Sequence, residues 1–339
     1  MTGESNQDSE IVSGITHTLG DIASGIGGIP LPPMVKRSVW KALGTLIAGA
    51  VDVPAAWLES KAQAIRDDTT GRSLFTSEAA KSAARKFDSD EQLIERAVEH
   101  FGARILKEQR NRETVVQSAM KDLVSTPPSE DTTQEIDEDW LDMFSRIAEK
   151  KSNQDMQLYL ARLLAGEIRK PGSFAPSSVE VLSKLTPDLA RTFQNFCNIS
   201  TVLASTVING LVYFDNESPF VLTEPYGAPG ENALSDVGFR YNVIAQLQDA
   251  GLVQYELSAW REIPALAFML PIEIGGTKLS LAAPEHFPQE SIHNMRRLKV
   301  INFTAAGVQL RNVVDKAPNE KYVQKVREWV SSIYGLQRG

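Results

Sequence analysis

A set of carboxylates in the central third of the chain comes nearest to the residue types needed for acid–base chemistry. Paired carboxylates cleave glycosides, one as the acid and the other as the base or nucleophile. Glu167 is the sharpest single candidate, because it follows an apolar Leu-Leu-Ala-Gly run and has Arg162 and Arg169 nearby as ion partners. The simpler interpretation is that it ties a helix end to the following Pro-Gly-Ser-Phe loop. The remaining acids of this set stand at an expected helix start, where carboxylates favour the helix dipole: Asp137, Glu138, Asp139 and Asp142.

Other catalytic and cofactor motifs are incomplete. Gly275-Gly276-Thr277-Lys278 lacks the first glycine of a phosphate-binding loop. A single cysteine, Cys197, excludes an internal disulfide and a multi-thiolate metal site, and its apolar neighbours indicate a core residue. Two of the four histidines are close in sequence, and their proline-containing segment is typical of a solvated loop: His286 and His293. We therefore expect no catalytic residue, no metal and no cofactor; an enzyme centred on Glu167 stays open as a third hypothesis.

A short basic strip suggests a different kind of site. Arg296, Arg297 and Lys299, extended by Arg311, lie where the chain predicts the wing of a winged helix, and wing residues contact phosphates in DNA-binding proteins. The candidate recognition helix nearby offers Arg240 as its one positive charge. The chain as a whole carries a net charge of −8, which disfavours nonspecific binding to phosphates. Nucleic acid is thus the less favoured partner.

The sequence divides into four parts that would position these residues, and their patterns together predict a mainly α protein. Residues 1–72 are a glycine-rich apolar segment, and residues 73–134 form a long helical arm and a linker. Residues 135–213 predict a central helical bundle, and residues 214–339 a winged-helix-like α+β module. Within the arm, apolar residues recur at helical spacing, which predicts an antiparallel hairpin or an oligomer contact: Leu93, Ile94, Ala97, Phe101, Ile105 and Leu106. We expect the protein to self-associate, and a protein partner stays open.

The N-terminal segment contains an uncharged run, residues 42–51, that Asp52 and Pro54 interrupt before it is long enough to span a bilayer. Trp40 and Trp57 flank this run, and a continuous helix would place them roughly 25 Å apart, near the separation of membrane aromatic belts. We favour burial of this segment in a core or oligomer over contact with a membrane surface. The contact residues would be Trp40, Leu43, Leu46, Ile47 and Trp57. Because the first ten residues are polar and acidic, we expect a cytoplasmic protein, with peripheral association with the inner membrane as the alternative.

The central part also carries a recognisable signature: Trp140, Leu164, Ala165, Gly166, Glu167, Pro171, Gly172 and Phe174. With this signature, residues 135 to 215 resemble an uncharacterised bacterial family, domain of unknown function number 2806. The C-terminal "AGLV … FTAAGVQL" pattern and the apolar opening more loosely resemble abortive-infection alpha-type proteins. These resemblances imply a role in phage defence, with the signature residues as structural positions. The expected function is a noncatalytic interaction or effector protein, and the main alternative is a winged-helix nucleic-acid-binding regulator.

Overall fold

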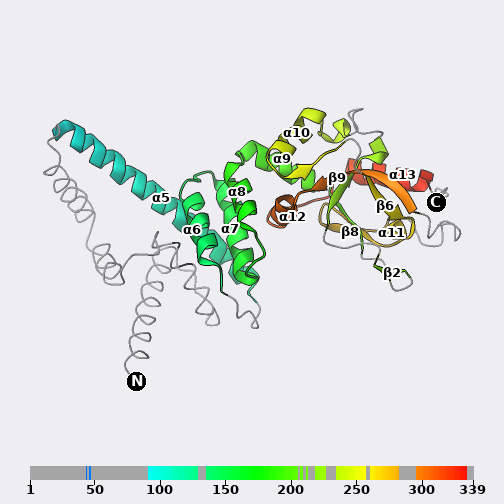
Figure 1. Ribbon diagram of the computed structural model, residues 1–339, viewed down its shortest axis with the longest axis horizontal. Helices are drawn as coiled ribbons and strands as arrows, with labels where there is room; N and C mark the ends of the chain where they lie inside the picture. Colours follow the sequence, from blue (N-terminus) through cyan, green and yellow to red (C-terminus); the bar gives the residue numbers. More distant parts are fainter. Residues whose placement is uncertain are drawn as a thin grey trace, which may run out of the picture. The chain divides into compact units, whose positions relative to one another are not determined.

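The computed structural model describes Leu43, Leu46 and residues 91–128, 135–204, 207–208, 211–212, 218–226, 234–256, 260–281 and 295–333 (Figure 1). The chain divides into two compact units, Met1–Ser173 and Phe174–Gly339. Helix outweighs strand in the described residues, and unit 2 contains an antiparallel sheet. The protein is therefore a mixed α+β protein, where the sequence predicts mainly α.

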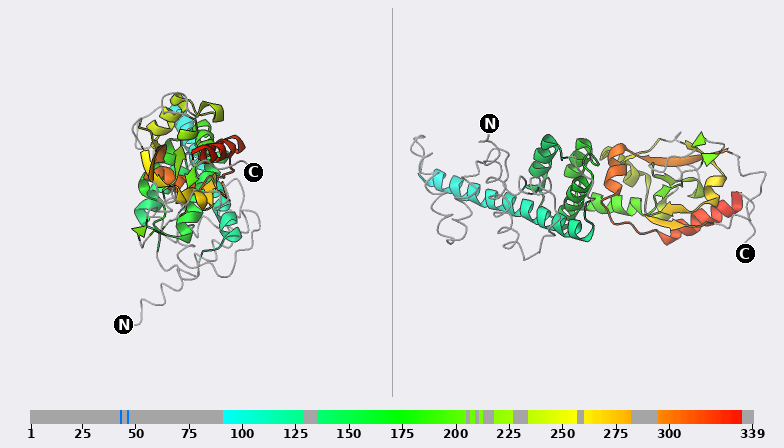
Figure 2. Two further views of the ribbon diagram at one scale, coloured as in Figure 1. Left: turned by 90° about the vertical axis from the view of Figure 1, so that its right-hand side faces the viewer. Right: turned by 90° about the horizontal axis from the view of Figure 1, so that it is seen from below.

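Residues 91–128 and 135–173, the continuous described stretches of unit 1, contain three helices. They are α5 (Glu91–Ser125), α6 (Glu138–Ala148) and α7 (Gln154–Arg169). Figure 2 shows α5 as one continuous helix, which confirms the long helix that the sequence predicts here. Its second half packs against α6 and α7 through fully buried apolar side chains: Val115, Val116, Ala119, Phe144, Leu160, Leu163 and Leu164.

Side chains cap two of these helices. Asp137 accepts a hydrogen bond from the Trp140 backbone nitrogen at 2.8 Å, so this acid of the predicted helix start is a cap. Asn153 caps α7 by accepting from the Met156 nitrogen at 3.2 Å. The sequence predicts Ser152 and Asp155 as the caps of α7. This prediction is wrong, because Asn153 is the N-cap residue with extended backbone and Asp155 lies inside the first turn of the helix.

Buried polar groups join α5 to the turn between α6 and α7. The Arg112 guanidinium pairs with the Glu149 carboxylate at 2.8 Å, and the Asn111 side chain donates to the Glu149 carbonyl at 2.7 Å. At the other end of α7, Arg169 forms an ion pair with Asp122 and donates to the Thr126 carbonyl. These contacts fix the second half of α5 to both ends of α7.

Unit 2 contains six helices in its described part: α8 (Pro176–Lys184), α9 (Pro187–Cys197), α10 (Tyr241–Asp249), α11 (Leu266–Met269), α12 (Ala305–Arg311) and α13 (Glu320–Ile333). Thr186 caps α9 and Pro187 takes its first position, as predicted. The capping box predicted for Ser177 and Glu180 is wrong, because α8 begins at Pro176 and its N-cap is Ala175. Pro176 instead starts that helix with its fixed φ.

A seven-stranded antiparallel sheet forms the second layer of unit 2, in the order β5-β9-β4-β1-β7-β8, with β6 also paired to β9. Its strands are β1 (Thr201–Val202), β4 (Phe220–Leu222), β5 (Val253–Gln254), β6 (Trp260–Pro264), β7 (Ile272–Ile274), β8 (Thr277–Leu279) and β9 (Met295–Phe303). A separate hairpin joins β2 (Val207–Ile208) to β3 (Leu211–Val212), and two 3-10 turns are η1 (Glu224–Tyr226) and η2 (Ser235–Val237). One long strand over residues 265–274 is predicted, but Leu266–Met269 is helical and β7 covers the last three residues.

Aromatic side chains fill the core between helices and sheet. Phe196 contacts Phe239 edge-on at 5.1 Å between ring centroids and Phe303 at 5.5 Å. Tyr322 of α13 is fully buried, and its hydroxyl accepts from the Leu222 nitrogen at 3.0 Å and donates to the Leu222 carbonyl at 3.1 Å. A side chain of α13 thereby continues the hydrogen bonding of β4.

Candidate functional site

The signature glutamate serves the loop after α7. Glu167 is 2% exposed, and its carboxylate accepts a hydrogen bond from the Gly172 backbone nitrogen at 2.6 Å. Gly172 has φ of +83°, a left-handed conformation that side chains rarely adopt. The carboxylate therefore holds the Pro-Gly turn against the helix end through the Gly172 backbone nitrogen, as the simpler interpretation predicts.

The other signature residues contribute packing. Trp140 stacks on Phe144 with 5.2 Å between ring centroids. Four apolar residues of the signature are buried: Trp140, Leu164, Ala165 and Phe174. Gly166 and Pro171 are half-buried. These six signature residues therefore lie wholly or partly in the interior.

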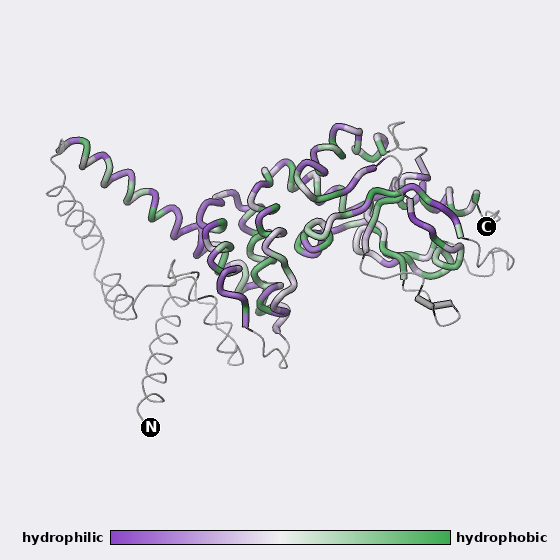
Figure 3. The backbone as a smooth tube through the Cα atoms, viewed as in Figure 1, coloured by the Kyte–Doolittle hydropathy of each residue, from purple (hydrophilic) through white to green (hydrophobic). Residues whose placement is uncertain are grey.

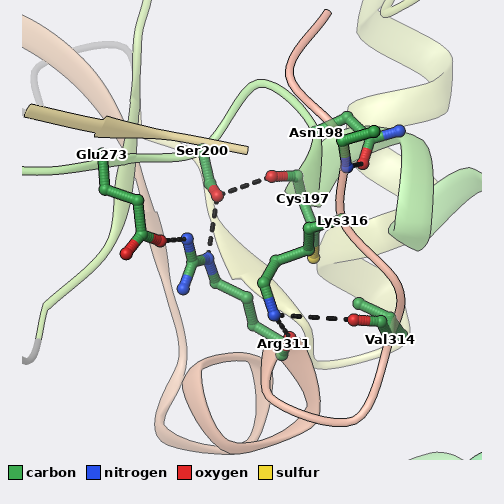
Figure 4. Close-up of polar contacts among 8 residues, drawn as sticks. Cys197, Asn198, Ser200, Glu273, Arg311, Val314 and Lys316 are labelled. Carbon is green, nitrogen blue, oxygen red and sulfur yellow. Dashed lines mark hydrogen bonds and ion pairs between the residues drawn. The ribbon is translucent and has the colours of Figure 1, made fainter. Parts of the chain in front are cut away.

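A cluster of polar side chains in the described part of unit 2 surrounds Arg311, the last residue of α12 (Figure 4). Its guanidinium is 7% exposed, donates to the Ser200 hydroxyl at 2.8 Å and forms an ion pair with Glu273 of β7. Ser200 donates in turn to the Cys197 carbonyl at 2.6 Å, and the Lys316 ammonium donates to the Arg311 carbonyl at 2.7 Å. We call these groups the Arg311 clamp: Cys197, Ser200, Glu273, Arg311 and Lys316.

The backbone beside the Arg311 clamp is equally close-packed. The Gly275 nitrogen donates to the Ser200 carbonyl at 2.9 Å, and a Cβ on Gly275 would lie 2.5 Å from the Asn198 carbonyl oxygen. The Asn198 side chain accepts from the Ala317 nitrogen at 2.9 Å. The end of α9, the β7–β8 turn and the α12–α13 connection are thus fixed to one another.

Burial shifts the pKa values of two groups of the clamp, the Cys197 thiol and the Lys316 ammonium. Desolvation raises the pKa of the Cys197 thiol to about 12, so the thiol stays neutral and is a poor nucleophile near pH 7. Desolvation, with the Arg311 charge second, lowers the pKa of Lys316.

Placing Arg311 in the basic surface strip was wrong: its charge is paired inside the unit. The cluster joins residues far apart in sequence, and no local spacing signals it.

The other three residues of the predicted basic strip, Arg296, Arg297 and Lys299, lie on β9. This strand pairs with β6, and we call the two paired strands the β6–β9 ribbon. Register pairs Trp260 with Lys299, Glu262 with Arg297 and Ile263 with Arg296. Successive strand residues alternate between faces, so Arg297 and Lys299 share one face with Trp260, while Arg296 lies on the other and donates to the Ile333 carbonyl at 3.0 Å. The residues of the predicted basic strip therefore lie on two opposite faces of the ribbon. The structure also adds Trp260, which the sequence reasoning missed.

A second exposed feature lies on the first half of α5, where four large apolar side chains are 42–56% exposed: Leu93, Phe101, Ile105 and Leu106. Along this helix, hydrophobic residues recur between hydrophilic ones (Figure 3). The packed half of α5 begins at Asn111 and Arg112, the first buried residues of the helix whose side chains the structure describes. One helix thus has a packed half and an exposed half.

Several predicted residues fall outside the described part of the chain: Trp40, Ile47, Trp57, His286 and His293. Leu43 and Leu46 are helical and buried. Within the described ranges, no helix has the length and apolar character to cross a bilayer, and no three His, Cys, Asp or Glu side chains are grouped to hold a metal.

Comparison with known proteins gives one match. A family model described as protein of unknown function (DUF2806) matches residues 95–327. The matched range begins inside α5 and ends inside α13, so it covers far more than the signature residues. No curated protein and no solved structure matches the chain significantly.

Proposed function

This chain belongs to the DUF2806 family of proteins of unknown function, and we propose that it is a noncatalytic interaction protein that self-associates through the first half of α5. The proposed partner is a second copy of the chain. The exposed apolar row on α5 carries this proposal.

That row has the geometry of a helix-packing surface. Leu93, Ala97, Phe101 and Ile105 follow one another at intervals of four residues, which forms a ridge along a helix. The ridge is roughly 18 Å long. Soluble monomers rarely expose large contiguous apolar patches, so such a ridge favours contact with another helix. Two copies of α5 related by a two-fold axis near Phe101 would each place this ridge in the groove of the other.

The proposal extends to phage defence through the resemblance to abortive-infection proteins. In this mechanism the folded units shield the apolar N-terminal segment until a trigger releases it towards a membrane or partner. The burial of Leu43 and Leu46 supports the shielded state.

Sedimentation of the full chain at several concentrations tests the self-association. Phe101→Glu combined with Ile105→Glu places charges on the ridge and should convert the oligomer to a monomer. Leu158→Glu is the matched control, because Leu158 is 41% exposed on α7, away from the ridge. A wild-type chain that stays monomeric, or an oligomer that survives the double substitution, would refute the proposal.

A second candidate function is nucleic-acid binding by a winged helix. Its support is the order β4-β9-β5 in the sheet, with α9 before β4 in the chain and α10 between β4 and β5, because a winged helix has a comparable order of elements. In this hypothesis α11, β7 and β8 are an insert in the wing, and α10 presents Arg240, Asn242 and Gln246 to a duplex. Duplex binding that Arg240→Ala and Asn242→Ala abolish would support it, and unchanged binding would exclude α10 as the reader.

A further inference from the structure

We infer that the exposed face of the β6–β9 ribbon binds single-stranded nucleic acid, with a base stacked at Trp260 and Arg297. We call this face the ribbon face and define it by Trp260, Glu262, Met295, Arg297 and Lys299. The inference goes beyond self-association. It names a nucleic-acid class and places the contact on the ribbon instead of α10.

The stacking platform consists of two planar groups. Trp260 is 47% exposed, and the Arg297 guanidinium carbon lies 4.2 Å from the centroid of its ring. The Arg297 side chain is itself 69% exposed, so the guanidinium that lies over the ring is accessible from solvent. Bases of single strands stack on exposed aromatic rings and on arginine planes, whereas bases inside a duplex are already stacked. The platform therefore suits a single strand better than a duplex.

The charges around the platform suit a phosphate backbone. Lys299 lies directly opposite Trp260 on the neighbouring strand, within reach of a strand that stacks on the ring. Glu262 accepts from Arg297 at 3.1 Å, which keeps the guanidinium beside the indole in the absence of a ligand. Arg297 and Lys299 are the two cations of the ribbon face and Glu262 is its one carboxylate, so the face carries a net positive charge in a chain of net charge −8, and local positive charge attracts anions.

An acidic protein segment would also meet these cations, but it would leave the aromatic platform without a planar partner. Met295 is 43% exposed on the same face and adds apolar contact for a base or sugar. A nucleic acid offers both a planar base for the ring and phosphates for the two cations, so it is the favoured ligand of the ribbon face.

Fluorescence anisotropy of the full-length protein with a labelled oligothymidylate of about 16 nucleotides, at about 50 mM salt, tests the inference. Trp260→Leu keeps an apolar side chain of similar reach but removes the ring, and should weaken binding roughly 5- to 150-fold. Trp260→Tyr should retain most of the affinity. Tyr241→Ala is the matched control, because Tyr241 is a 61%-exposed aromatic residue on α10, and it should bind like the wild type.

Three outcomes would overturn the inference. They are wild-type affinity in Trp260→Leu, equal competition by a glutamate peptide of similar length, and tighter binding of a duplex that Tyr241→Ala weakens. The last result would instead support the α10 reader. If Trp260→Leu loses its native circular dichroism, Lys299→Gln decides: the slope of log affinity against log salt should fall by about 0.7 for one lost phosphate contact, and an unchanged slope refutes the inference. The ridge variants of α5 should bind the oligonucleotide per chain as the wild type does, so this test is separate from that of self-association.

Discussion

Replacing Glu273 with glutamine should destabilise unit 2 strongly, because it leaves the Arg311 charge without its counter-charge. Arg311 is 7% exposed, so water can replace the lost carboxylate only in part. Removing one partner of a buried ion pair costs about 3–5 kcal/mol. Glu273 is partly exposed, with 28% of its side chain accessible, which places the expected loss near the lower end of that range.

A thermal melt followed by circular dichroism measures this loss. For a domain of this size each kcal/mol shifts the midpoint by about 2–4 °C, so the transition of unit 2 should fall by about 6–12 °C. Glu180→Gln is the control: it breaks an ion pair with Lys184 that is exposed and screened by water, so its midpoint should stay close to that of the wild type. The joint replacement Glu273→Leu with Arg311→Met removes both charges and should recover much of the stability. If Glu273→Gln shifts the midpoint no more than Glu180→Gln does, the clamp does not stabilise the unit.

Three further predictions concern the surroundings of this clamp and of α13. Gly275→Ala should cost more than Gly172→Ala in chemical denaturation, because its Cβ would clash with backbone at 2.5 Å whereas Gly172 has open space; equal losses would contradict this. Cys197 should resist alkylation at pH 8 in the native protein and react fully in denaturant, since its thiol pKa is raised to about 12; rapid native labelling would disagree. Burial raises the pKa of Tyr322, so the folded state holds its proton more tightly. The contribution of Tyr322 to stability should therefore be constant below about pH 10 and be lost above it, and Tyr322→Phe should reduce the loss of stability above pH 10 while costing roughly 1–3 kcal/mol at pH 7.

Local features were predictable from sequence wherever neighbouring residues decide them. The helix of residues 91–125, the caps at Asp137 and Thr186 and the loop contact of Glu167 all depend on spacings of a few residues. Periodicity and capping chemistry therefore gave the helices of residues 135–200 nearly as they are.

Contacts between distant residues were not predictable in the same way. Ser200, Glu273 and Arg311 meet only because β7 pairs with β1 and α12 follows β9. Likewise, Trp260 joins Lys299 through a register that the short apolar runs do not specify. A basic run alone could not distinguish Arg297 on the surface from Arg311 in the interior, since burial depends on the partner that the fold supplies.

The position of β9 in the sheet has a consequence for synthesis on the ribosome. Within the described strands, β5 and β6 pair with β9 alone. Leu222 of β4 cannot pair with Val300 of β9 until Val300 has been synthesised. At ordinary elongation rates the intervening chain takes on the order of 4–16 s to emerge, during which these edges have no neighbour. The nascent chain should therefore be most vulnerable to misassociation shortly before its last strand leaves the exit tunnel.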